Sequence, residues 1–500
     1  MAKLKFGWSE KTYSEDKPII LSGQFHARVS KGIHDPLMIN ALAIDDGKDS
    51  VVFVSADTAI IYNGSIEAIR EKVAARCPDF DGMKIVLNAT HTHTAPDMDG
   101  GYGLAYCEDA GITDWHESFD HFNDVVADCV CEAWENRASG TYAYGYGYAV
   151  VAHSRRVIYF DDVSKRPGAV NNSTHGVNGT AVMYGNTNDD NFASYEAGAD
   201  HFVNLLYTFD DKDDLTGAII NVPCPSQNSE SEYWQSADYW SDVRDAIHAK
   251  HPGIHIVTQC AAAGDLSPRI LHYKQAQARR FALKYGIDTA AANRSNETEL
   301  SARKDIAERI AAAFEEVLSW AQKDKRSEGS LTHAVKNIRL SRRPLNEEQY
   351  KAAIAGKKAA CEIPFKTDGT PAERVYENSM NQSNRDRYNC IIERYEAQQT
   401  DKKVDMELHC VALDDIAFVT NKYELYMDFE HRMQARSPFE QTFIVQLVAQ
   451  PGRGGGTYLA TERGFKGRGY SASIYCNEVS YEGGQELVEE SVKLLKEIHG

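Results

Sequence analysis

The stretch Asn88-Ala89-Thr90-His91-Thr92-His93-Thr94-Ala95-Pro96 follows directly on residues 84–87, a short apolar run that predicts a buried strand. Because side chains of an extended backbone alternate between two faces, His91 and His93 are predicted to point the same way. Ligands of α/β proteins bind at the carboxyl ends of strands, where this pair is expected. The pair favours a metal site, or one metal ligand beside a group that polarises a substrate. The alternative is a hydrogen-bonded structural patch.

Working outward from this stretch, apolar runs and helical periodicity predict an α/β fold with mixed β-sheets and flanking helices. A strand at 51–57, a helix at 65–75 and the strand at 84–88 favour a parallel unit. Further strands are expected at 141–151, 216–222, 254–260, 408–419 and 442–448, and further helices at 116–136, 238–250, 297–323 and 486–499. Residues 171–194 are predicted to be a loop, because they are rich in Asn, Gly, Asp and Thr and lack a clear period.

The chain is predicted to form one intertwined catalytic domain over residues 1–500, because no internal repeat or low-complexity linker is apparent. Residues 346–400 are highly charged with a helical pattern, and we expect them to form a peripheral helical segment.

The composition and charge of the chain indicate which classes of binding partner to expect. The net charge of -19 argues against nucleic acid and against an anionic membrane, so the expected partner is a small-molecule substrate. The ten cysteines include no CxxC pair and are predicted to be reduced, intracellular thiols. No apolar signal segment or bilayer-length run is visible, so we expect a soluble, cytoplasmic protein. The oligomeric state is not indicated.

Reactive groups also follow four other predicted strand ends, at residues 221–227, 263–269, 418–424 and 454–462. Each group has an ordinary structural alternative. Ser267 could cap a helix, Glu424 could favour a helix dipole, Tyr458 could be core, and Cys224 could be a small buried hydrophobe. Their joint occurrence, in this order, favours a site.

The order of these motifs resembles the catalytic domain of the neutral, non-lysosomal ceramidases and related bacterial proteins. Residues 91–96 match the family's HTHSGP-type motif, and residues 264–268 match its GD(V/L)SP motif, which carries the essential serine, here Ser267. Ser154-Arg155-Arg156 is similar to the family's Asn-Arg segment, with Ser154 in place of Asn. The likeness runs from about residue 23 to residue 488 and implies a divergent, bacterial-type member with a ceramidase-like α/β domain.

The resemblance implies one zinc ion per chain. Glu424 falls where the family has Pro-Gly-Glu, and Tyr458 begins a segment similar to its Tyr-x-x-Thr, so His91, Glu424 and Tyr458 are the implied ligands. The family's second histidine ligand is missing. Alignment on residues 236–238, similar to the family's Ser-(Ala/Gly)-Asp, places Cys224 at its position without a gap. A thiolate is a good zinc ligand, so Cys224 is predicted to substitute. The alternative is that Cys224 is a bystander and the metal is weakly held, different or absent.

The resemblance also implies the catalytic groups. His93, Arg155 and Tyr470, which lies close to the family's spacing beyond Tyr458, would bind the carbonyl oxygen as charge develops. Ser267 would position the scissile group or pass on a proton. No Ser-His-Asp triad is predicted, because nothing in the sequence pairs Ser267 with a base.

The predicted activity is zinc-dependent hydrolysis of an amide or ester bond in a small, polar, soluble substrate by a metal-activated water. Ceramide lies in membranes, and the sequence shows neither the signal peptide nor the C-terminal immunoglobulin-like domain of the family's secreted members. Asp97 and Asp99 replace the glycine-rich loop expected after the histidine motif, which favours a polar or cationic substrate. Two alternatives remain: a metal-dependent lyase or glycosidase-like enzyme acting on a sugar derivative, and a non-catalytic binding protein that has lost its zinc.

Overall fold

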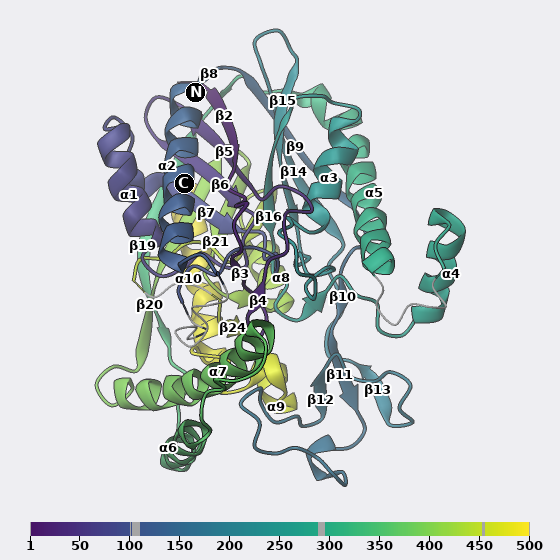
Figure 1. Ribbon diagram of the computed structural model, residues 1–500. Helices are drawn as coiled ribbons and strands as arrows, with labels where there is room; N and C mark the ends of the chain where they lie inside the picture. Colours follow the sequence, from purple (N-terminus) through teal and green to yellow (C-terminus); the bar gives the residue numbers. More distant parts are fainter. Residues whose placement is uncertain (1, 101, 103–110, 289–295, 453–455, 500) are drawn as a thin grey trace.

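Three β-sheets form the centre of the molecule (Figure 1). The computed structural model describes residues 2–100, 102, 111–288, 296–452 and 456–499. The first sheet has the order β7-β6-β5-β2-β8, formed by β7 (Ile85–Ala89), β6 (Ser50–Ala56), β5 (Met38–Asp45), β2 (Lys5–Thr12) and β8 (Ala138–Ser139). The second has the order β16-β15-β14-β9, formed by β16 (His255–Cys260), β15 (Leu215–Val222), β14 (Phe202–Phe209) and β9 (Thr141–Tyr148). The third has the order β19-β20-β21-β23, formed by β19 (Leu331–Ser341), β20 (Lys403–Leu413), β21 (Ile416–Thr420) and β23 (Gln441–Val445).

The same arrangement of elements occurs in each of the three sheets. In each, two strands form an antiparallel hairpin, and the second of them is followed by a helix and then by a strand parallel to it: β6-α1-β7, β15-α3-β16 and β21-α8-β23. These connecting helices are α1 (Ser65–Arg76), α3 (Tyr239–His248) and α8 (Met427–Arg436). A longer helix follows each parallel strand: α2 (Trp115–Glu135), α5 (Asn296–Ala321) and α10 (Tyr481–His499). The chain therefore contains a threefold structural repeat, which the sequence analysis did not find.

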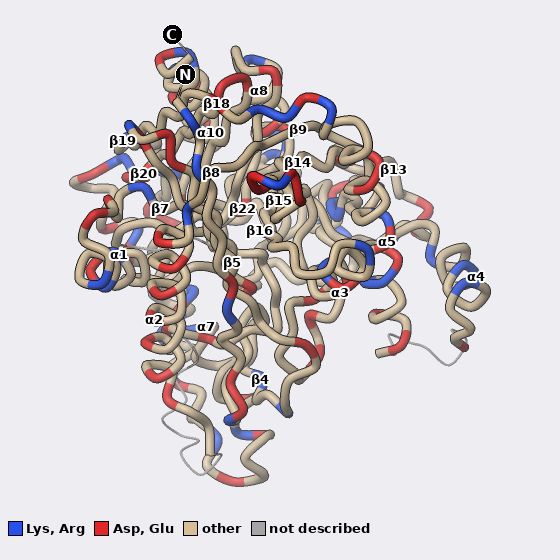
Figure 2. The backbone as a smooth tube through the Cα atoms, turned by 90° about the horizontal axis from the view of Figure 1, so that it is seen from above, with Lys and Arg blue, Asp and Glu red and all other residues tan. Residues whose placement is uncertain are grey.

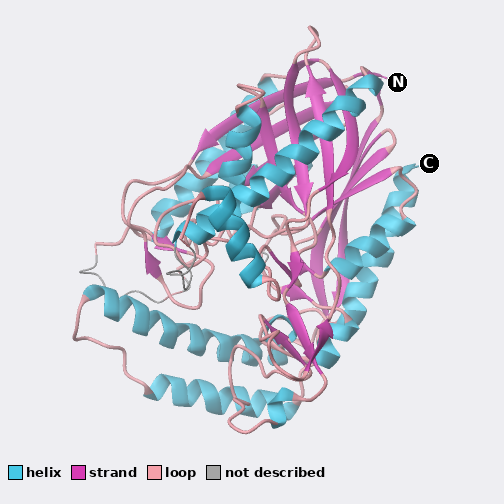
Figure 3. Cartoon of the chain, turned by 90° about the vertical axis from the view of Figure 1, so that its right-hand side faces the viewer, coloured by secondary structure: helices cyan, strands magenta, loops and turns pink. Residues whose placement is uncertain are grey.

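The sheets pack their inner faces together and cover their outer faces with helices. Phe53, Ile219 and Phe418, one from each sheet, belong to one buried cluster at the centre, and the rings of Phe53 and Phe418 lie 4.5 Å apart. Separate clusters join each outer face to its own helices. Figure 3 shows α3 and α5 crossing the second sheet in this way. Burial of one such large side chain contributes roughly 1.5–3 kcal/mol. The predicted fold class, α/β with mixed sheets and flanking helices, is confirmed.

Residues 346–400 form two helices below the sheets, α6 (Glu347–Glu362) and α7 (Pro371–Ala397) (Figure 3). Both begin with a capping box, in which Asn346 and Thr370 accept from the backbone three residues on. The predicted loop at 171–194 is only partly correct, because β12 (Ala181–Met183) and β13 (Phe192–Tyr195) pair with the two edges of β11 (Arg156–Tyr159). These strands are short, so no periodicity revealed them.

Charged residues lie mainly on the outer helices and loops (Figure 2). The second repeat has a further helix, α4 (Lys274–Tyr285), which buries only Phe281 and stands out from the body. Among the described residues, no helix is both long enough and apolar enough to cross a membrane.

The stability of the protein is expected to decrease below pH 6.5 because of His333. Its Nε2 lies 2.9 Å from His409 Nδ1 and its Nδ1 lies 3.2 Å from the carbonyl oxygen of Ser50, so it joins the third sheet to the first. Burial, with the charges of His409 and Lys84, holds the pKa of His333 well below its usual value.

Folded His333 is therefore neutral, whereas the unfolded chain takes up a proton as the pH falls below about 6.5. Stability is fully present above that pH and decreases below it by about 1.4 kcal/mol per pH unit for one proton. Urea unfolding at pH 7.5, 6 and 5 should show a shallower decrease in His333→Gln than in the parent. Replacing the exposed His116 by glutamine is the control. Equal slopes in parent and His333→Gln would contradict the assignment.

Candidate active site

The carboxyl ends of the three parallel strand pairs meet at one place, and the candidate residues lie there. The segment after β7 provides His91 and His93, the segment after β16 provides Ser267, and the segment after β21 provides Glu424. Cross-connections hold these segments together: Asn88 pairs with Val448, Gln446 N donates to the Cys260 carbonyl at 3.0 Å, and Gly264 N donates to the Leu425 carbonyl at 2.8 Å. The threefold repeat thus gathers residues from distant parts of the chain.

His91 is held in an unusual backbone conformation. β7 ends at Ala89, and His91 has φ 68°, in the left-handed region that non-glycine residues rarely adopt. Its backbone N donates to the Thr58 carbonyl at 2.9 Å, and its Nδ1 lies 2.7 Å from the carbonyl oxygen of Ala59. The rings of His91 and His93 lie 4.9 Å apart. The sequence analysis expected strand alternation to point the two side chains the same way, but the strand has already ended at Ala89, and His91 lies outside extended backbone.

Glu424 faces His91 and lies opposite Tyr458 on a neighbouring strand. Its Oε2 lies 3.2 Å from His91 Nε2. The short parallel strands β22 (Glu424–Leu425) and β24 (Tyr458–Leu459) align Glu424 with Tyr458. Burial opposes ionisation of Glu424, but His91 and Arg155 outweigh it and lower its pKa. Gly264 has no side chain here for a steric reason, since a Cβ would lie 2.3 Å from the Glu424 carbonyl oxygen.

Arg155 is a buried cation with several polar neighbours in the site. The pairing of β10 (His153–Ser154) with β17 (Leu266–Ser267) places it beside the 264–268 motif. Its guanidinium has five polar neighbours: the Gly264 carbonyl at 2.9 Å, Tyr458 OH at 3.2 Å, Gln227 Oε1 at 3.3 Å, Tyr184 OH at 3.4 Å and Glu424 Oε2 at 3.6 Å. Arg155, itself in the second repeat, therefore connects the second and third repeats through one buried cation.

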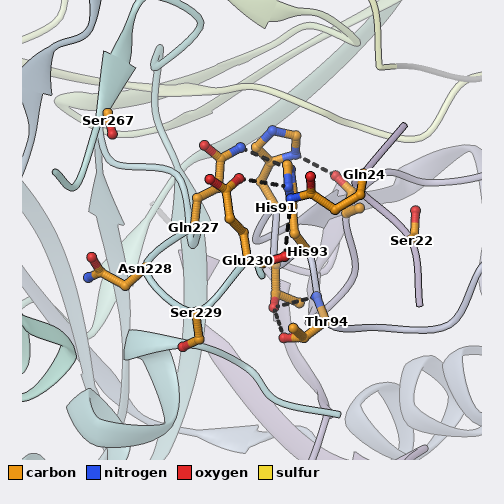
Figure 4. Close-up of polar contacts among 12 residues, drawn as sticks. Ser22, Gln24, His91, His93, Thr94, Gln227, Asn228, Ser229, Glu230 and Ser267 are labelled. Carbon is orange, nitrogen blue, oxygen red and sulfur yellow. Dashed lines mark hydrogen bonds and ion pairs between the residues drawn. The ribbon is translucent and has the colours of Figure 1, made fainter. Parts of the chain in front are cut away.

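His93 lies between two side chains that the sequence analysis did not assign. Its Nδ1 is 3.2 Å from Glu230 Oε2, and its Nε2 is 2.9 Å from Gln227 Nε2 (Figure 4). Burial lowers the pKa of His93, and Glu230 opposes that shift. Glu230 forms a further ion pair with Arg269. Gln227 and Glu230 lie in the loop after β15, so their position at a strand end was the available signal.

Ser267 is fully buried and bonded to neutral groups. Its Oγ accepts from the Arg269 backbone N at 3.1 Å and from Tyr184 OH at 3.3 Å. It lies apart from His93 in Figure 4. Among the described residues, no imidazole or carboxylate is hydrogen-bonded to its hydroxyl.

Tyr470 packs against aromatic rings at the site, and a cation from α7 lies over its ring. Its ring lies 5.7 Å from Tyr458 and 5.4 Å from Phe25, and Arg387 of α7 lies over it at 5.8 Å. Burial raises the pKa of the Tyr470 hydroxyl, so it stays protonated at neutral pH. The peripheral helical segment therefore reaches the wall of the site.

Asp97 and Asp99 do not form a freely ionised pair. Asp97 is buried, and burial together with Asp99 holds its pKa well above its usual value. The pair keeps a proton at pH values where isolated aspartates are ionised, which weakens the charge that the sequence analysis expected beside the histidines.

Cys224 does not join His91, Glu424 and Tyr458. It is fully buried in the apolar cluster of the second sheet, and its Sγ lies 3.5 Å from the Val151 carbonyl oxygen. Burial raises the pKa of the thiol well above its usual value, which disfavours a thiolate. Among the described residues, no three His, Cys, Asp or Glu side chains are arranged to hold a metal. This geometry matches the bystander alternative for Cys224.

The remaining three donors nevertheless suit a metal. The Ala59 carbonyl oxygen can only accept, so His91 carries its proton on Nδ1 and directs the Nε2 lone pair at Glu424 Oε2, 3.2 Å away. Two acceptors facing each other require a proton or a cation between them. In metal sites, the second ring nitrogen of a ligating histidine commonly donates to a group such as a backbone carbonyl. Catalytic zinc typically takes three protein ligands.

The fold is that of the bacterial neutral ceramidases. The structure superposes on the neutral ceramidase of Pseudomonas aeruginosa with a TM-score of 0.65 and 16% sequence identity, covering 99% of this chain and 75% of that one. A ceramidase in complex with C2 gives a TM-score of 0.63 and 15% identity, covering 99% of this chain and 76% of that one. Comparison of the sequence with protein-family models and with curated proteins gives no match.

Proposed function

We propose that the protein is a zinc-dependent hydrolase that cleaves an amide or ester bond of a small, polar, soluble substrate. The observation that carries the proposal is the opposed pair His91 Nε2 and Glu424 Oε2, 3.2 Å apart, with Arg155 against the same carboxylate. His91, Glu424 and Tyr458 would hold the metal. The ceramidase fold supports the reaction class, because ceramidases hydrolyse an amide.

The chain's own groups would act around the scissile carbonyl. A bound zinc ion would supply a water of lowered pKa. Arg155 and Tyr470 would face the oxygen that gains negative charge, and each donor of this kind contributes roughly 3 kcal/mol. Ser267, held by Tyr184 and the Arg269 backbone, would orient the scissile group. His93 differs from these groups, since both of its ring nitrogens already have polar partners.

A pocket of about 580 Å³ supports a substrate of modest size. Tyr184 and Arg269 line it, with Pro268, Leu271 and Phe281 among its apolar walls. The Tyr184 hydroxyl contacts both Ser267 Oγ and Arg155 Nη1, so one side chain, Tyr184, separates the pocket from these two groups. Its mixed walls suit a ligand that carries both polar and short apolar groups.

The expected result for the purified protein is about one zinc per chain, retained without added metal. His91→Ala and Glu424→Gln should each reduce the zinc content well below half, whereas Ser267→Ala should keep it and lose hydrolysis. Metal analysis and hydrolysis of soluble N-acyl amides and esters test this. Loss of zinc from Ser267→Ala would contradict the assignment of ligands.

Two further measurements test the reaction and the substrate class. In heavy-oxygen water a hydrolase incorporates solvent oxygen into its product, whereas a lyase does not. Micellar long-chain ceramide should be cleaved more slowly than soluble amides. Turnover of ceramide at a comparable rate would contradict the small polar substrate.

A further inference from the structure

The hydrogen bonds around His93 have a direction that can be derived from donor chemistry alone. Arg155 has no acceptor atom, so its Nη1 must donate to Gln227 Oε1, at 3.3 Å. The Gln227 amide group on the other side is then the donor toward His93 Nε2, at 2.9 Å. His93 Nε2 therefore accepts, and its ring proton lies on Nδ1.

The Nδ1 atom lies beside a carboxylate that can accept this proton. Glu230 Oε2 lies 3.2 Å from Nδ1 as an ion-pair contact that is not aligned as a hydrogen bond, and no other described residue bonds to this nitrogen. Burial opposes ionisation of Glu230, but the contact with His93 and the charge of Arg269 outweigh it, so the pKa of Glu230 lies far below its usual value. Glu230 therefore stays ionised, and an acceptor, at neutral pH.

Several contacts prevent the ring and the carboxylate from moving. Arg269 pairs with Glu230 and donates to the Asn228 carbonyl at 3.0 Å, while Gln24 donates to the Glu230 carbonyl at 3.1 Å. Gly23 lies flat against the imidazole, and a Cβ there would be 2.3 Å from His93 Cγ. The ring is thus packed against Gly23. Gln227 and Glu230 each lie beside one of its nitrogens (Figure 4).

We propose that Glu230 and Gln227 are positioning residues that fix His93 in the Nδ1–H tautomer, so that its Nε2 recognises a hydrogen-bond donor of the substrate. The inference rests on the proposed function and deepens it. Nε2 of this tautomer cannot donate to a carbonyl oxygen, so His93 does not share that role with Arg155 and Tyr470. An amide N–H of the substrate would take the place of the Gln227 amide at Nε2. Amides would then be preferred over esters of the same shape.

The tautomer is tested by nitrogen-15 NMR of histidine-labelled protein, with His93 assigned from the His93→Gln variant. The parent should show Nδ1 protonated. In Glu230→Gln, Arg269 needs the new amide oxygen as acceptor, so an amide donor faces Nδ1 while Gln227 still donates to Nε2. Neither tautomer is then favoured, and the signals should show a mixture of Nδ1–H and Nε2–H. Glu299→Gln is the matched control, because Glu299 lies 3.9 Å from Arg269 and is not a partner of His93. A parent with Nε2 protonated, or an unchanged tautomer in Glu230→Gln, would overturn the proposal.

The kinetic test compares an amide with the ester of the same acyl group. Glu230→Gln should lower kcat/KM for the amide about tenfold, mainly through KM, and leave the ester nearly unchanged. An equal loss on both substrates would show a merely structural role and would overturn the assignment. If the protein cleaves neither compound, the proposed function fails, while the NMR result still decides the tautomer.

Discussion

Replacement of Arg155 by alanine is expected to destabilise the folded protein by about 3–5 kcal/mol and to abolish hydrolysis, because it leaves the buried Glu424 carboxylate without its cation. The Arg155 side chain is only 2% exposed, so water cannot replace the lost charge. The same change frees the Gly264 carbonyl and the Gln227 amide, which bond to the guanidinium at 2.9 Å and 3.3 Å. The measurement is urea unfolding together with hydrolysis of a soluble amide.

Arg155→Lys separates stability from catalysis. Lysine keeps the charge near Glu424 but lacks the planar group that reaches five acceptors at once. We expect a folded protein with at most half the loss of stability and a fall of roughly 10²–10³ in kcat, the usual cost of one misplaced donor. Arg156→Lys is the matched control, because Arg156 is equally buried but pairs with Glu196 at 2.8 Å. Unchanged hydrolysis in Arg155→Lys would exclude Arg155 from the carbonyl contact.

The sequence was sufficient for the elements but not for their arrangement. The apolar runs at 51–57, 84–88, 216–222 and 254–260 became strands, because each is buried on both faces. The threefold repeat was invisible, since a strand of a packed sheet needs only apolar residues, and Phe53, Ile219 and Phe418 satisfy that equally. Repeats that share a burial pattern need not share amino-acid identities.

Backbone pairing brings some of the candidate residues from the motifs together, while their roles stay predictions. The pairing of β10 with β17 places Arg155 beside the segment of Ser267, and the pairing of β22 with β24 places Glu424 opposite Tyr458. Glu230 was missed because its role depends on the ring of His93, more than a hundred residues away, and not on a local pattern. The sequence shows which residue types follow each strand, whereas the fold determines which side chains contact one another.

Replacement of Cys224 by histidine is expected to destabilise the protein and not to restore a fourth metal ligand. Cys224 is fully buried in the apolar cluster of the second sheet, and Tyr239 OH donates to its carbonyl oxygen at 2.6 Å. An imidazole there overfills the site, at about 1–3 kcal/mol, and buries polar atoms without partners, at a similar further cost.

The smaller change Cys224→Ser keeps the fold and tests the metal directly. It should leave zinc content and affinity close to those of the parent, because the sulfur contacts backbone carbonyls and not His91, Glu424 or Tyr458. Thiol reagents should modify Cys224 only on unfolding, at the same rate with and without chelator. If chelator exposes the thiol or if Cys224→Ser loses zinc, the sulfur is a ligand after all. The ungapped alignment with the family's histidine would then outweigh the packing, and the loop after β15 would have to turn the thiol toward Glu424 when metal binds.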